Sequence, residues 1–311
     1  MPELPEVETV RRGIEAAGLE GPVREVWRSD DRLRIGRAWA REREGLAALR
    51  GARPGGIDRR GKYLLWDFVQ RSGRPTCLLL HLGMSGRCAV VSGDAAPAPH
   101  THLRLGFGDG RELRFVDPRR FGGLRVAPRA RLERDEPLAA LGPEPFDPAF
   151  DGAWLHQRLG RSRRALRDAL LDQGVVAGIG NIYANEALFV ARLHPLEHGA
   201  RLGAAAFTRL AEALRVVLDE AIHEGGTSLR DYRDVSGGSG RMQARLRVYG
   251  RAGEPCRDCG APLRAFTSQG RSGCFCPRHQ RRRPERPGDA AGVTRRRGGR
   301  AAATGRGARG S

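Results

Sequence analysis

The sequence predicts an α+β multidomain protein, in which an N-terminal helix and a β-sandwich precede a helical domain and a small C-terminal hairpin. Three observations support this prediction. The first residues carry a helical apolar stripe, the next segment contains short apolar runs of strand length, and helical periodicity then returns ahead of a cluster of cysteines. A chain of 311 residues is long enough for two domains that each bury a core.

Residues 5–18 have the pattern of an amphipathic helix. Pro5 suits the first turn, where its missing N–H is not needed, and Glu6 and Glu8 lie at the positive end of the helix dipole. Gly18 suits the left-handed conformation that ends many helices. One apolar stripe runs along this helix: Val7, Val10, Ile14 and Ala17.

Short strands dominate the rest of an N-terminal domain that we place at residues 1–130. The runs 63–68 and 76–82 have strand length and consist mostly of apolar residues. A turn at Asp109-Gly110 separates two alternating segments, as in a β-hairpin. Several strands without intervening helices predict a β-sandwich.

Changes in composition divide the remainder of the chain. Prolines interrupt any regular pattern at 131–150, which predicts a linker there, and a helical domain follows at 151–224. A loop region rich in glycine and serine covers 225–244, and the cysteine hairpin covers 245–280. The tail at 281–311 has almost no large apolar residue, so we expect it to be disordered. It is either a basic arm that assists binding or a dispensable extension.

The charge predicts a polyanionic partner. The chain has 55 Lys and Arg against 36 Asp and Glu, a formal net charge of +19. The tail holds ten arginines against two acids and so contributes +8, which leaves +11 for residues 1–280. Nucleic acid is the simplest polyanion, and a merely soluble basic surface is the alternative.

The same composition argues against a membrane protein or an exported one. No apolar run approaches the ~18 residues of a membrane span. The start of the chain carries acidic residues where a secretory signal carries basic ones, so we expect a cytoplasmic protein.

Lys62 is the single lysine of the chain, because every other cation is arginine. A preference for arginine codons explains the general bias, but it does not explain why this position is lysine. A primary amine can lose its proton and take part in acid–base or Schiff-base chemistry, whereas a guanidinium cannot.

The cysteine spacing predicts a metal site. Two residues separate Cys256 from Cys259, and two separate Cys276 from His279, which gives a tetrahedral Cys3His set suited to Zn²⁺. Cys274 competes with Cys276 for the third position, although the spacing favours Cys276. A disulfide framework is the alternative and does not suit a chain without an export signal. The two remaining cysteines lie alone on predicted strands and are expected in the core: Cys77 and Cys88.

The amino terminus holds a candidate nucleophile. Pro2 follows the initiator methionine, whose removal would leave a secondary amine with a pKa near 8, against about 10.4 for lysine. Such an amine can attack C1′ of a deoxyribose and form an iminium. Glu3 is adjacent and Glu6 lies one helical turn further along.

Taken together, these motifs resemble the Fpg branch of the Fpg/Nei family of DNA glycosylases. The resemblance runs from Met1 to about Gln280. The motifs that carry it occur in one order: MPELPEVETVRRG, Arg60-Gly-Lys62-Tyr-Leu-Leu, His81-Leu-Gly-Met84-Ser-Gly-Arg87, Asp117-Pro-Arg119-Arg-Phe121-Gly, Gly178-Ile-Gly-Asn181-Ile-Tyr-Ala-Asn-Glu and the cysteine hairpin.

The resemblance implies a monomeric, bacterial DNA glycosylase and AP lyase of base-excision repair, with a helix-two-turn-helix domain and one structural zinc ion. Its expected partner is double-stranded DNA that contains oxidised purines, such as 8-oxoguanine or formamidopyrimidines. Two alternatives are a Nei-like glycosylase for oxidised pyrimidines and a non-catalytic, zinc-dependent DNA-binding protein.

The resemblance also implies catalytic roles. Pro2 corresponds to the nucleophile that forms the Schiff base, Glu3 to the proton donor, and Glu6 to a supporting carboxylate. Lys62 corresponds to a proton donor in β-elimination that reaches a phosphate. Arg271 corresponds to the arginine of the zinc hairpin that grips phosphates and is linked to δ-elimination.

Further positions are implied to contact DNA. Three of them would fill the gap left by the extruded base: Met84, Arg119 and Phe121. The others would bind along the strand: His81, His100, Asn181 and Tyr249.

The chain also departs from the family pattern. His279 stands where the commonest pattern has a fourth cysteine, and Cys274 stands where an aromatic residue is usual. In the stretch 161–167, where the family has a DNA-contacting lysine, the chain has several arginines, of which we select Arg163. The loop within 225–244 corresponds to the lesion-capping loop, which varies most among relatives.

Overall fold

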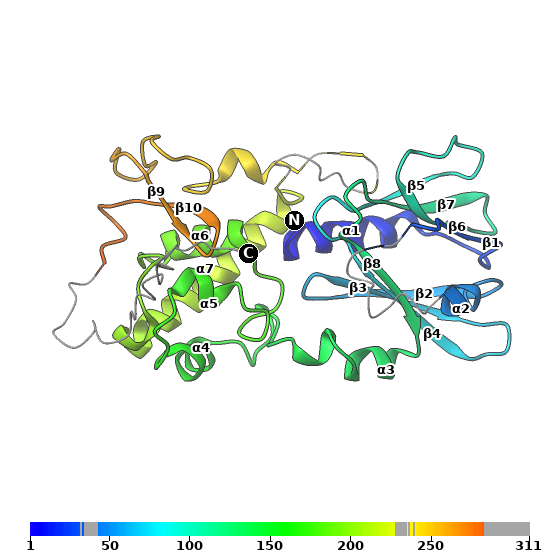
Figure 1. Cartoon of the computed structure of the whole chain (residues 1–311), viewed down its shortest axis with the longest axis horizontal. Coiled ribbons are helices and arrows are strands. Elements are labelled where there is room, and N and C mark those ends of the chain that lie inside the picture. The colour runs from blue at the N-terminus through cyan, green and yellow to red at the C-terminus, as the bar shows by residue number, and fades with distance from the viewer. Residues whose placement is uncertain (32, 34–42, 228–234, 236, 239, 283–311) are drawn as a thin grey trace, which may run out of the picture.

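The computed structural model describes residues 1–31, 33, 43–227, 235, 237–238 and 240–282. The chain forms two lobes with the amino terminus at the waist between them (Figure 1). The loop predicted at 225–244 is described only at its ends and at a few positions inside it. Nearly all of the predicted tail, from residue 283 onward, lies outside the described residues.

Helix α1 spans Leu4–Ala17, close to the predicted range. A capping box closes its first turn, because the carboxylates of Glu3 and Glu6 each accept a hydrogen bond from the backbone N–H of the other residue. Gly18 ends the helix in the left-handed conformation with φ 53°. Val7, Val10 and Ile14 of the predicted stripe are buried and face the protein interior, whereas Ala17 is only partly buried.

The predicted β-sandwich is present as two four-stranded antiparallel sheets, with the short helix α2 (Arg43–Ala47) near one edge. One sheet has the order β1-β6-β7-β5: Glu25–Arg28, Thr101–Gly106, Arg111–Val116 and Arg87–Ser92. The other has the order β2-β3-β4-β8: Arg53–Arg60, Tyr63–Val69, Pro75–His81 and Gly123–Ala127.

The predicted hairpin is the β6–β7 pair, in which Leu105 lies opposite Leu113 and Leu103 opposite Phe115. Large apolar side chains such as Phe68 and Phe115 fill the space between the sheets with 0% exposure. Cys77 and Cys88 are buried, as the sequence predicted.

The connection between the lobes is ordered and partly packed. It contains helix α3 (Arg129–Arg134) and the 3-10 helix η2 (Leu138–Ala140). Leu132 and Leu138 pack with Leu65 and Leu79 on the outer face of the second sheet. The prolines predicted an irregular linker here, and the buried leucines attach that segment to the sandwich.

The second lobe is helical. Its main helices are α4 Gly152–Leu159, α5 Leu166–Leu170, α6 Asn181–Val190 and α7 Ala204–His223, with the 3-10 helices η3 Gly199–Arg201 and η4 Met242–Arg245. Leu4 of α1 belongs to the core of this lobe, so the first helix joins the two lobes. None of the helices within the described ranges could cross a membrane.

A two-stranded hairpin lies against the helical lobe (Figure 1). It consists of β9 (Arg264–Ser268) and β10 (Arg271–Phe275), with Arg271 opposite Ser268. Gly273 permits a close approach to α6, because a Cβ there would lie 2.3 Å from Asn185 Oδ1.

Candidate functional site

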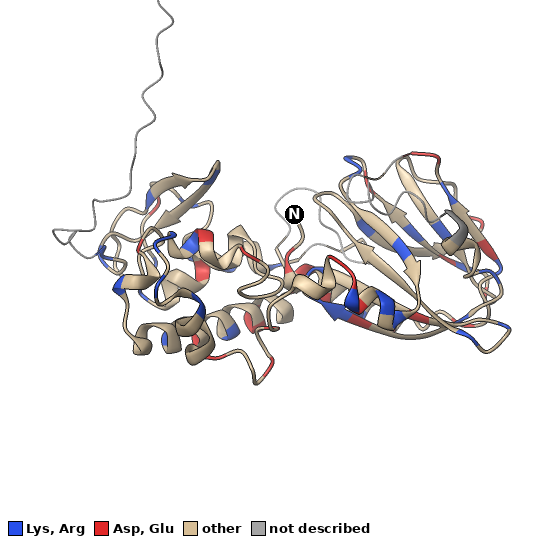
Figure 2. Ribbon diagram, turned by 60° about the horizontal axis from the view of Figure 1, so that its bottom comes forward, with Lys and Arg blue, Asp and Glu red and all other residues tan. Residues whose placement is uncertain are grey.

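The candidate nucleophile lies at the waist of the molecule. Pro2 and Glu3 are buried, and both views place the amino terminus between the lobes (Figures 1 and 2). The Glu3 carboxylate accepts hydrogen bonds from the backbone N–H groups of Gly180 at 2.8 Å and Ile182 at 2.9 Å. These groups belong to the start of α6, where the first backbone N–H groups have no partner within the helix and the helix dipole favours a carboxylate.

Gly180 explains why the segment before α6 approaches so closely. A Cβ at this position would lie 2.3 Å from the Cδ atom of Glu3. Gly178, with φ 86°, accepts a hydrogen bond from the Leu4 N–H at 3.0 Å through its carbonyl oxygen. The two glycines therefore let a segment 177 residues away in sequence surround Glu3.

Burial raises the pKa of Glu3, against the opposing effects of Lys62 and of the backbone donors. A carboxyl group in this position keeps its proton at a higher pH than an exposed glutamate does. The environment therefore suits a proton donor beside the amino terminus.

Glu6 joins three segments through one carboxylate. Its Oε2 accepts from the Glu3 N–H at 2.7 Å, and its Oε1 accepts from the Tyr183 hydroxyl at 2.5 Å and the Thr227 N–H at 2.7 Å. Burial, followed by the nearby charge of Glu3, raises the pKa of Glu6 to about 7. Thr227 is the last residue before a gap in the described residues, which falls within the predicted lesion-capping loop.

Lys62 lies in the same cluster. It follows Gly61, which forms the β2–β3 turn with φ 57°, and its Nζ donates to the Ile179 carbonyl at 2.9 Å. Burial lowers the pKa of Lys62, and the positive charge of Arg271 acts in the same direction. A buried amine with a lowered pKa gives up its proton more readily than an exposed lysine does.

Arg271 is exposed at the start of β10, and a buried arginine holds its backbone. Arg167 on α5 donates to the carbonyl oxygens of Ser268 at 2.8 Å and Arg271 at 3.2 Å. Its side chain is 0% exposed and pairs with Asp168 at 3.1 Å. Asp168 in turn accepts from the Ser268 hydroxyl at 2.5 Å.

The sequence reasoning missed Arg167 and selected Arg163 from the same stretch. Arg163 is exposed between α4 and α5, whereas Arg167 follows Leu166 on the buried side of α5. The sequence feature that could have identified Arg167 is a charged residue among the leucines of a short helix. Such a residue needs a partner in the interior.

Asn181 and Tyr249 lie beside the hairpin. Asn181 Nδ2 donates to the Ser272 carbonyl at 2.8 Å. Glu186, which the sequence reasoning also missed, accepts from three consecutive backbone N–H groups that end at Tyr249, at 2.8–2.9 Å. Burial raises the pKa of Tyr249, while a hydrogen bond with Asn181 acts in the opposite direction.

Two histidines named from the sequence differ in environment. His81 is buried at the end of β4, where its Nδ1 accepts from the Gly83 N–H at 3.0 Å. Burial and the charge of Lys62 lower its pKa to about 4, so the ring is neutral near pH 7. His100 is exposed with φ 62°, while its neighbour His102 is buried against the Asp117 carbonyl.

The three residues expected to fill the gap in DNA lie on two neighbouring turns. Met84 is 40% exposed although it is apolar. The guanidinium of Arg119 lies over the Phe121 ring, 4.7 Å from its centroid. An exposed apolar side chain beside a stacked arginine is an arrangement that can enter a base stack.

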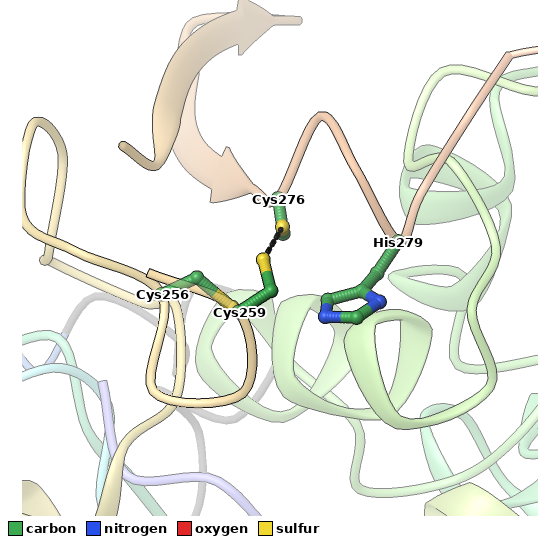
Figure 3. A group of neighbouring side chains, drawn as sticks. All are labelled: Cys256, Cys259, Cys276 and His279. Atoms are coloured by element: carbon green, nitrogen blue, oxygen red, sulfur yellow. Dashed lines mark hydrogen bonds between the residues drawn. The ribbon is translucent and has the colours of Figure 1, made fainter. Parts of the chain in front are cut away.

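The predicted metal ligands come together at the base of the hairpin (Figure 3). The ligand atoms of Cys256, Cys259, Cys276 and His279 all lie within 4.8 Å of one another. His279 Nε2 is buried without a hydrogen-bond partner, as expected of a nitrogen that binds a metal. Cys274 is buried nearby but is not part of this group.

Comparisons with known proteins agree with this geometry. Models of the formamidopyrimidine-DNA glycosylase N-terminal domain and H2TH domain match residues 1–124 and 141–233. The chain belongs to the formamidopyrimidine-DNA glycosylase family. The family resemblance and the α+β fold predicted from the sequence are thereby confirmed, and the protein is an enzyme of the DNA glycosylase class.

Individual relatives of this family cover most of the chain. The formamidopyrimidine-DNA glycosylase of Syntrophotalea carbinolica is 45% identical over 281 residues, which cover 90% of this chain and 100% of the relative. The crystal structure of MutM (Fpg) from Thermus thermophilus is 41% identical with a TM-score of 0.78, and covers 91% of this chain and 100% of its own.

A Lactococcus lactis Fpg structure contains DNA with an abasic site. It is 33% identical to this chain with a TM-score of 0.81, and the match covers 90% of this chain and 100% of that one. The prediction of a DNA partner is therefore confirmed at the level of the family.

Proposed function

We propose that the protein is a bifunctional DNA glycosylase and AP lyase that removes oxidised purines from double-stranded DNA through a Schiff base on Pro2. The observation that carries the proposal is that several groups suited to this chemistry meet between the two lobes. The amino-terminal segment, two buried carboxylates and the only lysine meet beside the start of α6. A simple DNA-binding module has no need of this costly group of buried charges.

The chemistry requires a free secondary amine at Pro2. Once the initiator methionine is removed, the proline nitrogen can form a bond to C1′ of the damaged nucleotide as the bond from C1′ to the base breaks. The base leaves with the bonding electrons, and the proline nitrogen gives up its proton, which the departing base takes up. Opening of the sugar then gives an iminium, and O4′ receives a proton for which the protonated Glu3 carboxyl is the candidate donor.

Strand cleavage follows from the iminium. Loss of a proton from C2′ allows the 3′ phosphate to depart, which is β-elimination, and a second elimination releases the 5′ phosphate. We assign Lys62 to proton transfer in these steps, because its buried amine has a lowered pKa and belongs to the same cluster as Glu3. We assign Arg271 to the phosphates of the extruded nucleotide, because it is an exposed cation whose backbone is fixed by Arg167.

DNA contacts extend from this centre. We propose that Asn181, Tyr249, His81 and His100 bind along the strand and that Met84, Arg119 and Phe121 replace the extruded base. Unstacking a base costs a few kcal/mol, and an inserted side chain offsets part of that cost.

Zinc is the metal that the ligand group fits. Three thiolates and one imidazole form a tetrahedral set, and the buried, unpartnered Nε2 of His279 supports this assignment. Four protein ligands leave no open coordination position, so the ion would organise the hairpin that carries Arg271. It would take no part in the reaction.

Borohydride trapping tests the proposal. A duplex with 8-oxoguanine should give a covalent adduct whose sequenced amino terminus shows attachment at Pro2. We expect Pro2→Gly to lose the adduct and Lys62→Ala to retain it. No adduct from a chain verified to begin at Pro2 would refute the proposed Schiff-base mechanism, and a stronger reaction with thymine glycol would indicate the Nei-like alternative.

A further inference from the structure

The two turns that carry Met84 and Arg119 touch each other through their backbones. Gly83 has φ 67°, and a Cβ there would lie 2.3 Å from the carbonyl carbon of Phe121. A Cβ at Gly122 would lie 2.8 Å from the His81 carbonyl oxygen. The two turns therefore approach so closely that only glycine fits at these two positions, although 34 residues separate Ser85 from Arg119.

A buried carboxylate joins the two turns. Asp117 is 0% exposed, and its Oδ1 accepts from the Ser85 hydroxyl at 2.6 Å. Its Oδ2 accepts from the Gly122 N–H at 2.7 Å. One side chain thus binds both the Met84 turn and the far end of the Arg119 turn.

Ser85 completes the connection. Its hydroxyl donates to Asp117 and accepts from the backbone N–H of Arg119 at 3.2 Å. The Arg119 N–H therefore donates to the Ser85 hydroxyl, which in turn donates to the Asp117 carboxylate. The backbone of the exposed arginine is fixed by two buried groups that do not reach the surface themselves.

We propose that Ser85 and Asp117 are positioning residues that make the Met84 and Arg119 turns one rigid wedge for insertion into duplex DNA. This inference rests on the proposed function and adds two residues to it. Flexible turns would have to become ordered as they entered the base stack, and that ordering would weaken binding of the opened duplex. A wedge that is already ordered avoids this loss.

The wedge is needed only where a base pair must be opened. An abasic site in single-stranded DNA has no partner base and no stacked gap to fill. Loss of the Ser85–Asp117 connection should therefore slow reaction with a lesion in duplex DNA and spare the single-stranded abasic substrate. A residue that only stabilised the fold would affect both substrates alike.

Single-turnover cleavage rates on these two substrates test the inference. Ser85→Ala removes two hydrogen bonds and leaves Asp117 Oδ1 without its donor, and Asp117→Asn keeps the shape but presents an NH₂ group to one of two donors. For each variant we expect the duplex rate to fall about tenfold, with the single-strand rate within about twofold of the unmodified protein. Ser92→Ala, at the exposed end of β5, is the matched control and should change neither rate.

Two results would overturn the inference. One is an unchanged duplex rate in both variants, and the other is a parallel fall of both rates. If the unmodified protein and the Ser92→Ala control cleaved neither DNA, the proposed function itself would fail. That failure would be visible before the Ser85 and Asp117 variants are compared.

Discussion

Replacement of Glu6 by glutamine should change how stability depends on pH. The pKa of Glu6 is raised from 4.5 to about 7, mainly by burial and then by the charge of Glu3. Each unit of pKa corresponds to about 1.4 kcal/mol, so the shift is equivalent to about 3 kcal/mol.

Whether stability rises or falls with pH depends on which state, folded or unfolded, binds the Glu6 proton more tightly. The folded protein holds the proton of Glu6 more strongly than the unfolded chain does. The carboxyl therefore contributes stability fully below pH 4.5, and this contribution is lost as the pH rises through about 7. Burial also raises the pKa of Glu3, which adds a dependence of the same sign.

The measurement is the melting temperature between pH 5 and pH 8.5. Glu6→Gln cannot titrate at this position, so its melting temperature should fall less over this range than that of the unmodified protein, by about 5 °C. Glu15→Gln, an exposed change on the same helix, should keep the original dependence. Identical dependences in the unmodified protein and Glu6→Gln would refute the assignment of a raised pKa to this carboxyl.

Three further predictions concern the hairpin and the start of α6. Arg167→Met should leave Asp168 as a buried charge without its ion-pair partner and should cost about 3–5 kcal/mol of folding free energy, measured by denaturant unfolding. Arg209→Met, on the exposed face of α7, is the control and should cost little. His279→Ala should release the metal, which we propose to be zinc, and abolish DNA binding, as measured by metal content and gel shift; survival of both would implicate Cys274 as the ligand. Gly180→Ala should displace Glu3 and reduce trapping at least tenfold, whereas Gly203→Ala meets nothing within 4 Å and should trap normally.

Local patterns in the sequence were sufficient for much of the fold. The helix at 5–18, the β6–β7 hairpin and the group of four candidate metal ligands each depend on residues close together in sequence. Periodicity, turn residues and ligand spacing report on such neighbours directly. The candidate catalytic residues were found through the order of separated motifs, since no single motif decided them.

The groups that hold the site in place were not predictable in the same way. Arg167 acts on a hairpin about a hundred residues away, and Glu186 acts on the segment before Tyr249. Asp117 lies in a motif whose arginine and phenylalanine, and not its aspartate, carry the implied DNA contacts. The partner of a buried charge depends on which segments the fold brings together, and sequence spacing does not contain that information.

Glu6 shows why these long-range contacts bear on function. The same carboxylate binds the backbone beside the candidate nucleophile, the Tyr183 hydroxyl on α6 and the N–H of Thr227 at the start of the loop expected to cover the lesion. Loss of the Thr227 hydrogen bond would leave fewer donors on this buried carboxylate and would raise the pKa of Glu6 further. The backbone of Glu3 would then lose part of its acceptor, because a protonated carboxyl accepts more weakly. The Glu3 backbone and the Thr227 backbone are therefore linked through one buried carboxylate, and we expect replacement of Glu6 to disturb both contacts together.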